Sequence, residues 1–216
     1  MKKLVSVLLC IAMLLSLACV VSAETEETTA PEIVWDENNE TILLEYGATY
    51  GEGEKSFQLV VDHLNQVVVC TVNTDEETVG AALAALNIVA GEDSQYGLMV
   101  NTIDGYTADY NVDGTYWAFY INGDYAMTGV DSTPIEDDTV YTFKVDGAEV
   151  EEGATISLVD GKHYGIGDTA FTLEVVDGEG NTTTVTVHTN EETLGAALAA
   201  LNIVAGEDSD FGLYIK

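Results

Sequence analysis

The sequence predicts an α+β protein in which one helix packs across a mixed sheet, and it predicts that this unit occurs twice. Residues 78–94 return as residues 193–209 with one change, Val79 to Leu194. In each copy a pair of β-branched runs, typical of a hairpin, precedes a stretch with apolar residues at helical spacing. A repeat of this length indicates a duplicated domain rather than a short solenoid unit.

Each copy is expected to open with a β-hairpin. Residues 56–61 and 67–72 are rich in valine and flank a turn at residues 63–66. In the second copy the turn reads Asp-Gly-Glu-Gly-Asn at residues 177–181, a stronger turn signal at the same place. The glycine-rich stretch 47–53 lacks the helix and lysine of a phosphate-binding loop and is interpreted as a turn between strands.

A helix is expected after each hairpin. Residues 74–77 and 189–192 follow the Thr-x-x-Glu pattern of a capping box, which would place acidic side chains in the first helical turn. Val79, Leu83 and Leu86 then form one apolar stripe at a spacing of about 3.6 residues.

Further strands are expected after the first helix, with turns at Asp104-Gly105 and Asn122-Gly123. The second copy ends before any counterparts of the strands expected at residues 115–121, 124–127 and 140–145. Its sheet is therefore expected to have an open apolar edge. We expect that segment to be protease-sensitive or to associate with another chain; an interrupted gene is the alternative. The expected strands cover residues 96–103, 115–121, 124–127 and 140–145.

The N-terminus predicts export. Lys2 and Lys3 precede an apolar run that ends in the small-x-small pattern at Ala23, which is typical of a cleaved signal peptide. A retained membrane anchor and a lipoprotein acylated at Cys19 are the alternatives. We therefore expect a secreted protein without a membrane span after cleavage, or alternatively one lipid-anchored at the cell surface. The expected divisions are a signal peptide (1–23), an acidic flexible leader (24–41), a first module (42–147), a linker (148–155) and a truncated second module (156–216).

The charge is strongly negative. The chain has 38 acidic residues against six basic ones, and after loss of Lys2 and Lys3 the four remaining give a net charge of −34. Such a surface repels nucleic acid, and no basic patch offsets it. Cys70 would be the one cysteine of the exported chain, and its valine-rich surroundings predict a small buried apolar side chain.

Residues 77–83, 91–98 and 116–123 read Glu-Thr-Val-Gly-Ala-Ala-Leu, Gly-Glu-Asp-Ser-Gln-Tyr-Gly-Leu and Tyr-Trp-Ala-Phe-Tyr-Ile-Asn-Gly. These blocks, extended by residues 127–135, resemble the DUF4430 family, also described as transcobalamin-like C-terminal domains and common in secreted proteins of Firmicutes. The resemblance implies a β-grasp-like fold. It also implies a distant relation to the small domain that covers one face of the corrinoid in the vitamin B12 carriers transcobalamin and intrinsic factor.

An aromatic segment is the best candidate for a binding site. Strand alternation places Tyr116 and Tyr120 on one face of the sheet and Trp117 and Phe119 on the other. One face is expected to belong to the core, and the other could form a flat platform for a planar ring or a sugar. A second core or a dimer face is the alternative. The candidate ligand-binding residues are Tyr116, Trp117, Phe119, Tyr120 and Tyr125.

A weaker candidate is a calcium site. Asp109, Asn111 and Asp113 lie at alternating positions before a glycine, like the first half of an EF-hand loop, but the acid required at the twelfth position would fall at Tyr120. A turn rich in Asp and Asn is the other interpretation.

No hydrolase, zinc, disulfide-exchange or nucleotide motif is present in the sequence, and the protein is predicted not to be an enzyme. We predict a secreted binding module that requires no cofactor, with a corrinoid or another planar small molecule as its ligand. The alternative is a cell-surface structural or adhesive module that binds protein or glycan and is stabilised by calcium.

Overall fold

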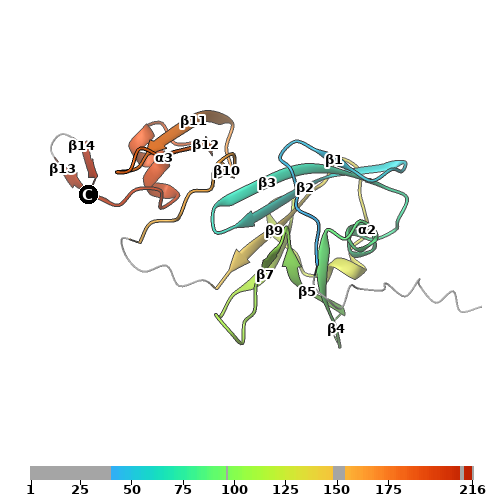
Figure 1. Cartoon of the computed structure of the whole chain (residues 1–216). Helices are drawn as coiled ribbons and strands as arrows, with labels where there is room; N and C mark the ends of the chain where they lie inside the picture. The colour runs from blue at the N-terminus through green and yellow to red at the C-terminus, as the bar shows by residue number, and fades with distance from the viewer. Residues whose placement is uncertain (1–39, 96, 148–153, 210–211, 216) are drawn as a thin grey trace, which may run out of the picture. The chain divides into compact units, whose positions relative to one another are not determined.

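The computed structural model describes residues 40–95, 97–147, 154–209 and 212–215 (Figure 1). The predicted signal peptide with Cys19, the acidic leader up to residue 39 and the linker at residues 148–153 lie outside the described residues. Within the described ranges the chain is mostly β, with two α-helices and both parallel and antiparallel strand pairs, which is compatible with the α+β class. None of the described helices is both long enough and apolar enough to cross a bilayer.

Residues 40–147, the first segment, form two sheets. The larger has the strand order β1-β3-β2-β9-β7-β8, and the smaller has the order β4-β5-β6. The elements are β1 (Thr49–Tyr50), β2 (Lys55–His63), β3 (Gln66–Thr74), α2 (Val79–Ala85), β4 (Val89–Ser94), β5 (Gly97–Ile103), β6 (Tyr106–Thr107), β7 (Tyr116–Ile121), β8 (Asp124–Tyr125), the 3₁₀ turn η1 (Val130–Ser132) and β9 (Val140–Asp146).

The β2–β3 hairpin is the centre of the larger sheet. Its turn residues Leu64 and Asn65 both have positive φ, as a two-residue hairpin turn requires. On the other side of β2, β9 pairs in parallel, so that Leu59 lies beside Tyr141 and Val61 beside Phe143. Alternation along these strands turns one apolar face toward the helix.

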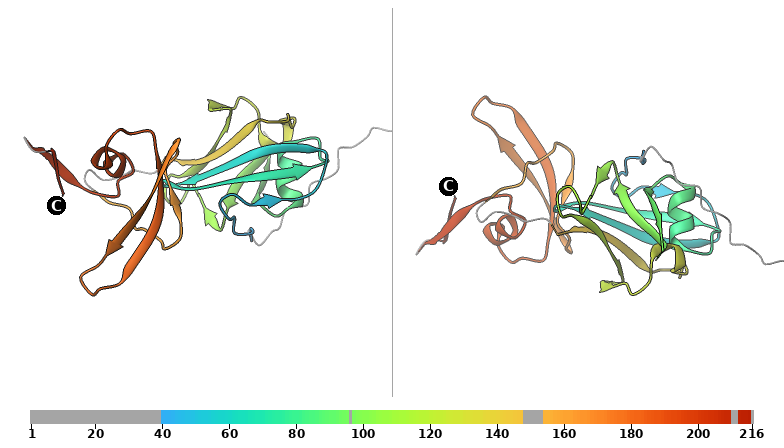
Figure 2. Two further views of the ribbon diagram at one scale, coloured as in Figure 1. Left: turned by 90° about the horizontal axis from the view of Figure 1, so that it is seen from above. Right: turned by 90° about the horizontal axis from the view of Figure 1, so that it is seen from below.

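Helix α2 covers that face, as Figure 2 shows. Its N-cap is Thr78, whose Oγ1 accepts a hydrogen bond from the backbone N–H of Ala81 at 3.3 Å. The predicted capping box at residues 74–77 is therefore wrong. Thr74 Oγ1 accepts from Glu76 N instead, and this turn redirects the chain from β3 before the helix begins.

Residues 154–209 and 212–215, the second segment, repeat the local pairing of the first. β10 is parallel to β12 as β1 is to β3, and Tyr164 Oη accepts from Val159 N as Tyr50 Oη accepts from Glu45 N. A bridge from Tyr164 to Gln66 joins β10 to β3. The elements are β10 (His163–Tyr164), β11 (Thr169–Val176), β12 (Thr182–Thr189), α3 (Leu194–Ala200), β13 (Gly206–Ser209) and β14 (Gly212–Ile215).

A glycine follows the short strand in both segments for the same reason. Gly51 and Gly165 have φ values of +74° and +73°, and a Cβ on either would overlap the backbone carbonyl oxygen of the neighbouring strand. The short strand β1 lies inside the stretch 47–53, which the sequence indicated as a simple turn.

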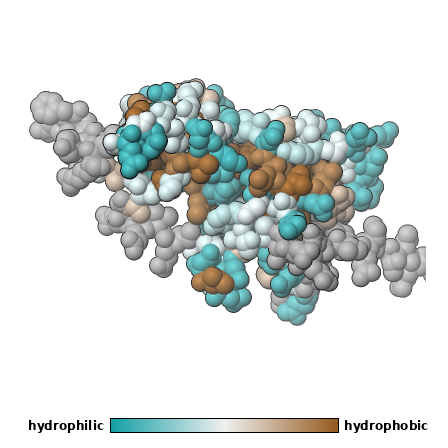
Figure 3. All heavy atoms as spheres, viewed as in Figure 1, coloured by the Kyte–Doolittle hydropathy of each residue, from teal (hydrophilic) through white to brown (hydrophobic). Residues whose placement is uncertain are grey.

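The core of the first segment is much larger than that of the second. Cys70 is buried in it, as predicted, and burial raises the pKa of its thiol to about 12, which keeps it uncharged and unreactive. In the second segment the buried cluster consists of Tyr164, Val185 and Val187. Apolar side chains also reach the surface in patches among polar ones (Figure 3).

A histidine pair links two strands of the second segment. His163 Nδ1 on β10 lies 2.9 Å from His188 Nε2 on β12, and the ring of Tyr46 stacks on His163 with ring centroids 3.9 Å apart. Burial lowers the pKa of both histidines, and the charge of His188 lowers that of His163 further. The folded state therefore favours the neutral rings.

Acidification is expected to destabilise the second segment through this pair. A histidine whose pKa is lower in the folded state than in the unfolded state stabilises the fold fully only above the ordinary histidine pKa of about 6.5. This contribution to the free energy of unfolding is lost as the pH falls through the folded-state pKa. Intrinsic amide exchange slows as the pH falls, so the quantity to follow is the protection factor, and that of the β12 amides should fall between about pH 7.5 and 5.5. A variant with both His163→Gln and His188→Gln should lack this loss of protection; an identical pH dependence of the protection factors in both proteins would contradict the prediction.

Candidate functional site

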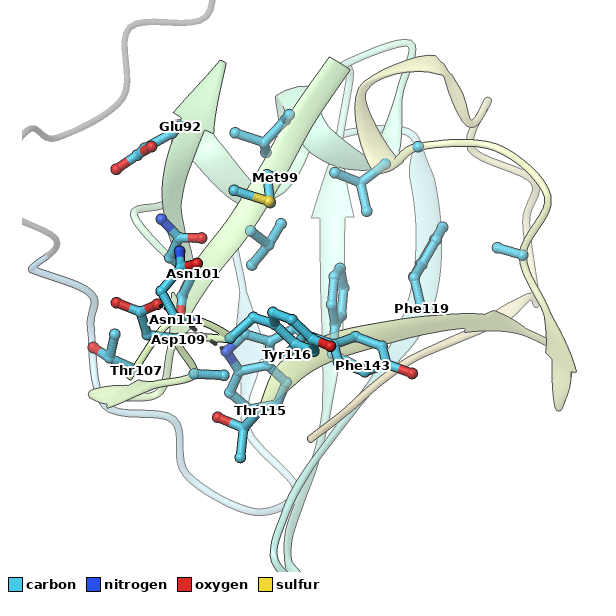
Figure 4. Close-up of a pocket in the computed structure, with 18 of the residues that line it drawn as sticks. Glu92, Met99, Asn101, Thr107, Asp109, Asn111, Thr115, Tyr116, Phe119 and Phe143 are labelled. Atoms are coloured by element: carbon cyan, nitrogen blue, oxygen red, sulfur yellow. Dashed lines mark hydrogen bonds between the residues drawn. The ribbon is translucent and has the colours of Figure 1, made fainter. Parts of the chain in front are cut away.

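A cavity of about 720 Å³ opens in the first segment between the small sheet and β7 (Figure 4). Glu92 of β4 and Met99 and Asn101 of β5 lie along one side. The loop from β6 to β7 closes one end, and residues 125–130 line the other. The site is built from elements that are distant in the chain but joined by tertiary packing.

Two tight turns bring these walls together. Asp104 and Gly105, with φ values of +52° and +73°, reverse the chain after β5, so that Ala108 N donates to Asn101 O at 2.9 Å. Asn122 and Gly123 likewise have positive φ and fold β8 back on β7. Both turns agree with the sequence prediction.

Buried aromatic rings form the floor. Trp117, Phe119 and Phe143 are buried, and the rings of Phe119 and Phe143 have their centroids 5.0 Å apart. The indole Nε1–H of Trp117 donates to Asn101 O at 3.1 Å, which fixes β7 against β5. The floor is therefore a rigid part of the core that also faces the cavity.

The rim is exposed and aromatic. Tyr116 and Tyr125 lie at the mouth of the cavity together with Tyr110, which is 71% exposed. Tyr116 Oη donates to Asp146 at 3.3 Å, and that carboxylate raises the pKa of Tyr116, so the phenol stays protonated. Met99, 55% exposed, supplies a flexible apolar wall opposite these rings.

Some polar side chains of the cavity lining make hydrogen bonds within the described residues and others do not. Thr107 Oγ1 bonds Thr102 Oγ1 at 2.8 Å, and Thr115 Oγ1 donates to Asp113. The side-chain amides of Asn101 and Asn111 make no hydrogen bond within the described residues. They can each donate to and accept from a ligand.

Charge in the lining is acidic. Glu92 and Asp109 are the charged residues among the described residues that line the cavity. Their carboxylates disfavour an anionic ligand and favour a neutral or cationic one.

Four of the five aromatic candidates line the cavity: Tyr116, Trp117, Phe119 and Tyr125. Tyr120 does not line it; its ring packs edge-on against Tyr125 with centroids 5.4 Å apart. From the sequence, one face of this strand was expected to belong to the core and the other to form an exposed platform. In the structure the core-facing Trp117 and Phe119 themselves form the cavity floor. They do so because β5 and residues 125–130 cover that face incompletely.

The candidate calcium residues form two separate turns. Asp109 Oδ1 accepts from Asn111 N at 2.9 Å, and Asp113 Oδ1 accepts from both N and Oγ1 of Thr115, which lowers the pKa of Asp113. Asp109 and Asn111 lie at the cavity wall, but Asp113 does not line it. Across the described part of the chain, no group of three or more His, Cys, Asp or Glu side chains is placed to hold a metal ion.

Met99, Asn101 and Val130 were not among the sequence candidates. Met99 and Asn101 occupy a strand that the sequence did predict, but their place in the wall depends on β5 packing over Trp117. The signal available in the sequence was an asparagine two residues after a methionine in an otherwise largely apolar strand.

Comparison with known proteins places this site inside a family match. Residues 76–154 match the model of DUF4430, a domain of unknown function, and every residue of the cavity lining falls within that range. None of the curated protein sequences compared with the chain matches it.

Two solved structures show partial likeness. One is a protein of Ruminococcus gnavus ATCC 29149 whose description ascribes metal binding to it, with 29% identity over 44% of this chain and all of that chain, at a TM-score of 0.42. The other is haptocorrin in complex with Cbi, with 18% identity over 46% of this chain and 27% of that chain, at a TM-score of 0.35. Such low TM-scores assign neither a fold nor a ligand, and the identification depends on the family match. The likeness that these comparisons support is to DUF4430, and it covers residues 76–154 of this chain.

Proposed function

We propose that residues 42–147 are a non-catalytic binding module that holds a small planar ligand in the cavity over Trp117 and Phe119. The observation that supports it is the cavity itself: a rigid aromatic floor, a methionine wall and two free amide groups. Its volume of about 720 Å³ lies in the range of small-molecule sites, which are mostly apolar with a few placed polar groups.

The proposed ligand is neutral or cationic, because the charged groups of the lining are acidic. A corrinoid is the leading candidate, from the resemblance of the sequence to transcobalamin-like domains. Its macrocycle is close to planar and bears amide side chains, which Asn101 and Asn111 can pair with.

A β-grasp-like arrangement is part of the proposal. A hairpin, a helix across its face and a strand returning in parallel beside the first strand of the hairpin are found in β2, β3, α2 and β9. The matching β10–β12, α3 and hairpin pairings support the idea that residues 156–216 are a second, partial copy.

Dicyanocobinamide is expected to raise the melting temperature of the exported chain and to give a saturable signal in calorimetry. Binding to the folded state alone contributes about 2.7 kcal/mol of stability at a hundredfold excess over Kd. Tyr116→Ala should weaken the binding at least tenfold because it removes a ring at the cavity mouth.

Tyr120→Ala is the matched control. It removes a tyrosine from the same strand outside the cavity, so its affinity should equal that of the unmodified chain. No stabilisation at millimolar dicyanocobinamide would overturn the corrinoid assignment. Equal losses in both variants would place the site elsewhere.

Export is the remaining part of the proposal and is supported by the signal-like N-terminus. We expect mass spectrometry of the mature protein, recovered from both the medium and the membrane fraction of its native host, to find an N-terminus at Glu24. A diacylated Cys19 would instead show the lipid-anchored form.

A further inference from the structure

Strand β11 is the edge of its sheet, although its counterpart β2 is a central strand. β2 has β3 on one side and β9 on the other. β11 pairs with β12 on the equivalent side, and no strand among the described residues pairs with its other side (Figure 2). The two segments therefore differ at the position that β9 occupies.

The open edge presents unpaired backbone groups. In the first segment, Gln58 N donates outward to Thr139 O, and Thr71 across the hairpin points its N–H away from β2, to Ala48 O. The backbone groups alternate in the same way in the second segment. Thr186 is the β12 residue opposite Thr172, and its N–H donates to Lys162 O, away from β11. Thr172 and Glu174 therefore direct their N–H and C=O groups to the open side.

The same edge leaves apolar side chains uncovered. Val61 in β2 lies beside Phe143 of β9 and is fully buried, whereas its counterpart Val175 is 41% exposed. The missing cover corresponds to Tyr141 and Phe143, which lie beside Leu59 and Val61 in the first segment.

We propose that β11 binds an extended segment of another protein as a parallel strand, with aromatic side chains at two alternate positions facing α3. The first segment is the template for this occupant, since β9 shows the orientation, the register and the side chains that fill the site. Strand addition of this kind takes affinity from backbone hydrogen bonds and specificity from alternate side chains. This interaction surface is separate from the cavity between β5 and β7.

The charge distribution favours a basic partner over a second copy of this chain. Glu174 projects from the middle of β11, and the exported chain carries 38 acids against four lysines. Pairing two β11 edges would bring these like charges together. A partner strand with a lysine next to its aromatic pair, as Lys144 follows Phe143 in β9, is the better match.

The probe is a fluorescein-labelled peptide with the sequence of residues 139–145 followed by two lysines, added to the exported chain. We expect saturable anisotropy and slowed amide exchange at Thr172, Glu174 and Val176. Replacing the tyrosine and phenylalanine of the peptide by serine should weaken binding at least tenfold.

Glu174→Pro tests the edge directly. Proline removes one outward N–H and is tolerated at an open edge, so the β11–β12 ladder should persist while peptide binding falls at least tenfold. Glu174→Ala is the matched control: it removes the same charge but keeps the backbone N–H, so it should lose only the charge attraction and bind clearly better than Glu174→Pro. Val175→Lys, which places a charge on the apolar face, should also abolish binding and serves if the proline variant is unfolded.

Three results would overturn the proposal. The first is that Glu174→Pro and Glu174→Ala bind the peptide equally well while the β12 amides stay protected from exchange. The second is that the peptide slows amide exchange in the first segment rather than in β11. The third is that the chain forms a stable dimer that excludes the peptide. None of these results concerns the cavity. Failure of the β11 proposal therefore leaves the proposed ligand site unaffected, and failure of the ligand proposal leaves the β11 proposal unaffected.

Discussion

Leu83→Ala is expected to lower the free energy of unfolding of the first segment by about 3–5 kcal/mol, the upper range for removing a fully buried leucine. Leu83 lies in the middle of α2 with no exposed surface and belongs to the core cluster that includes Phe57, Leu59 and Val72. The surrounding strands are paired on both sides and cannot collapse into the cavity that the substitution leaves. Amide exchange of β2 and β3 measures the loss.

Leu198→Ala is the matched comparison, because Leu198 holds the same position in α3 and is also buried. Phe171 and Leu173 on the edge strand β11 of the same segment are only half-buried, and this edge can move. We expect a loss of about 1–2 kcal/mol there. Equal losses in the two segments would contradict the view that the second core is incompletely covered.

Trp117→Ala is expected to cost about 3–5 kcal/mol in the same assay. It removes a buried ring that packs edge-on against Tyr106 at 5.9 Å, and it breaks the indole hydrogen bond to Asn101 O. Trp117→Phe should cost less, about 1–2 kcal/mol, because a ring remains and Asn101 O keeps its bond from Ala108 N.

A Trp117→Ala loss below about 1 kcal/mol would show that the cavity floor is not part of the core. The expected large loss also means that Trp117→Ala is a poor probe of ligand binding, since it removes the floor and the fold together. The exposed Tyr116 is the better choice, and its variant leaves the core intact.

The local parts of the fold could be predicted from the sequence. Asn122-Gly123 and Asp104-Gly105 specify tight turns by themselves, and the β-branched runs that became β2 and β3 specify strands, because these signals depend on neighbouring residues. The helix start was misplaced by four residues, because Thr78 and Thr74 are both chemically suitable caps and only the path of the chain after β3 distinguishes them.

The non-local parts could not be predicted. The parallel pairing of β2 with β9, the separate small sheet and the two-residue strand β1 all depend on contacts between distant residues. The same limit applies to the cavity. The aromatic segment identified much of the floor and rim, whereas Met99 and Asn101 enter the site through the packing of β5 over β7.

The central claim is that a planar ligand occupies the cavity over Trp117, and the indole N–H of Trp117 reports on it directly. The chain has two tryptophans, Trp35 and Trp117, so a nitrogen-15 correlation spectrum shows two indole signals, which Trp35→Phe assigns. During titration with dicyanocobinamide, the Trp117 signal is expected to shift saturably together with the amides of Met99 and Asn101, while the Trp35 signal stays in place. An unmoved Trp117 signal at millimolar ligand, or shifts confined to residues 154–215, would contradict the claim.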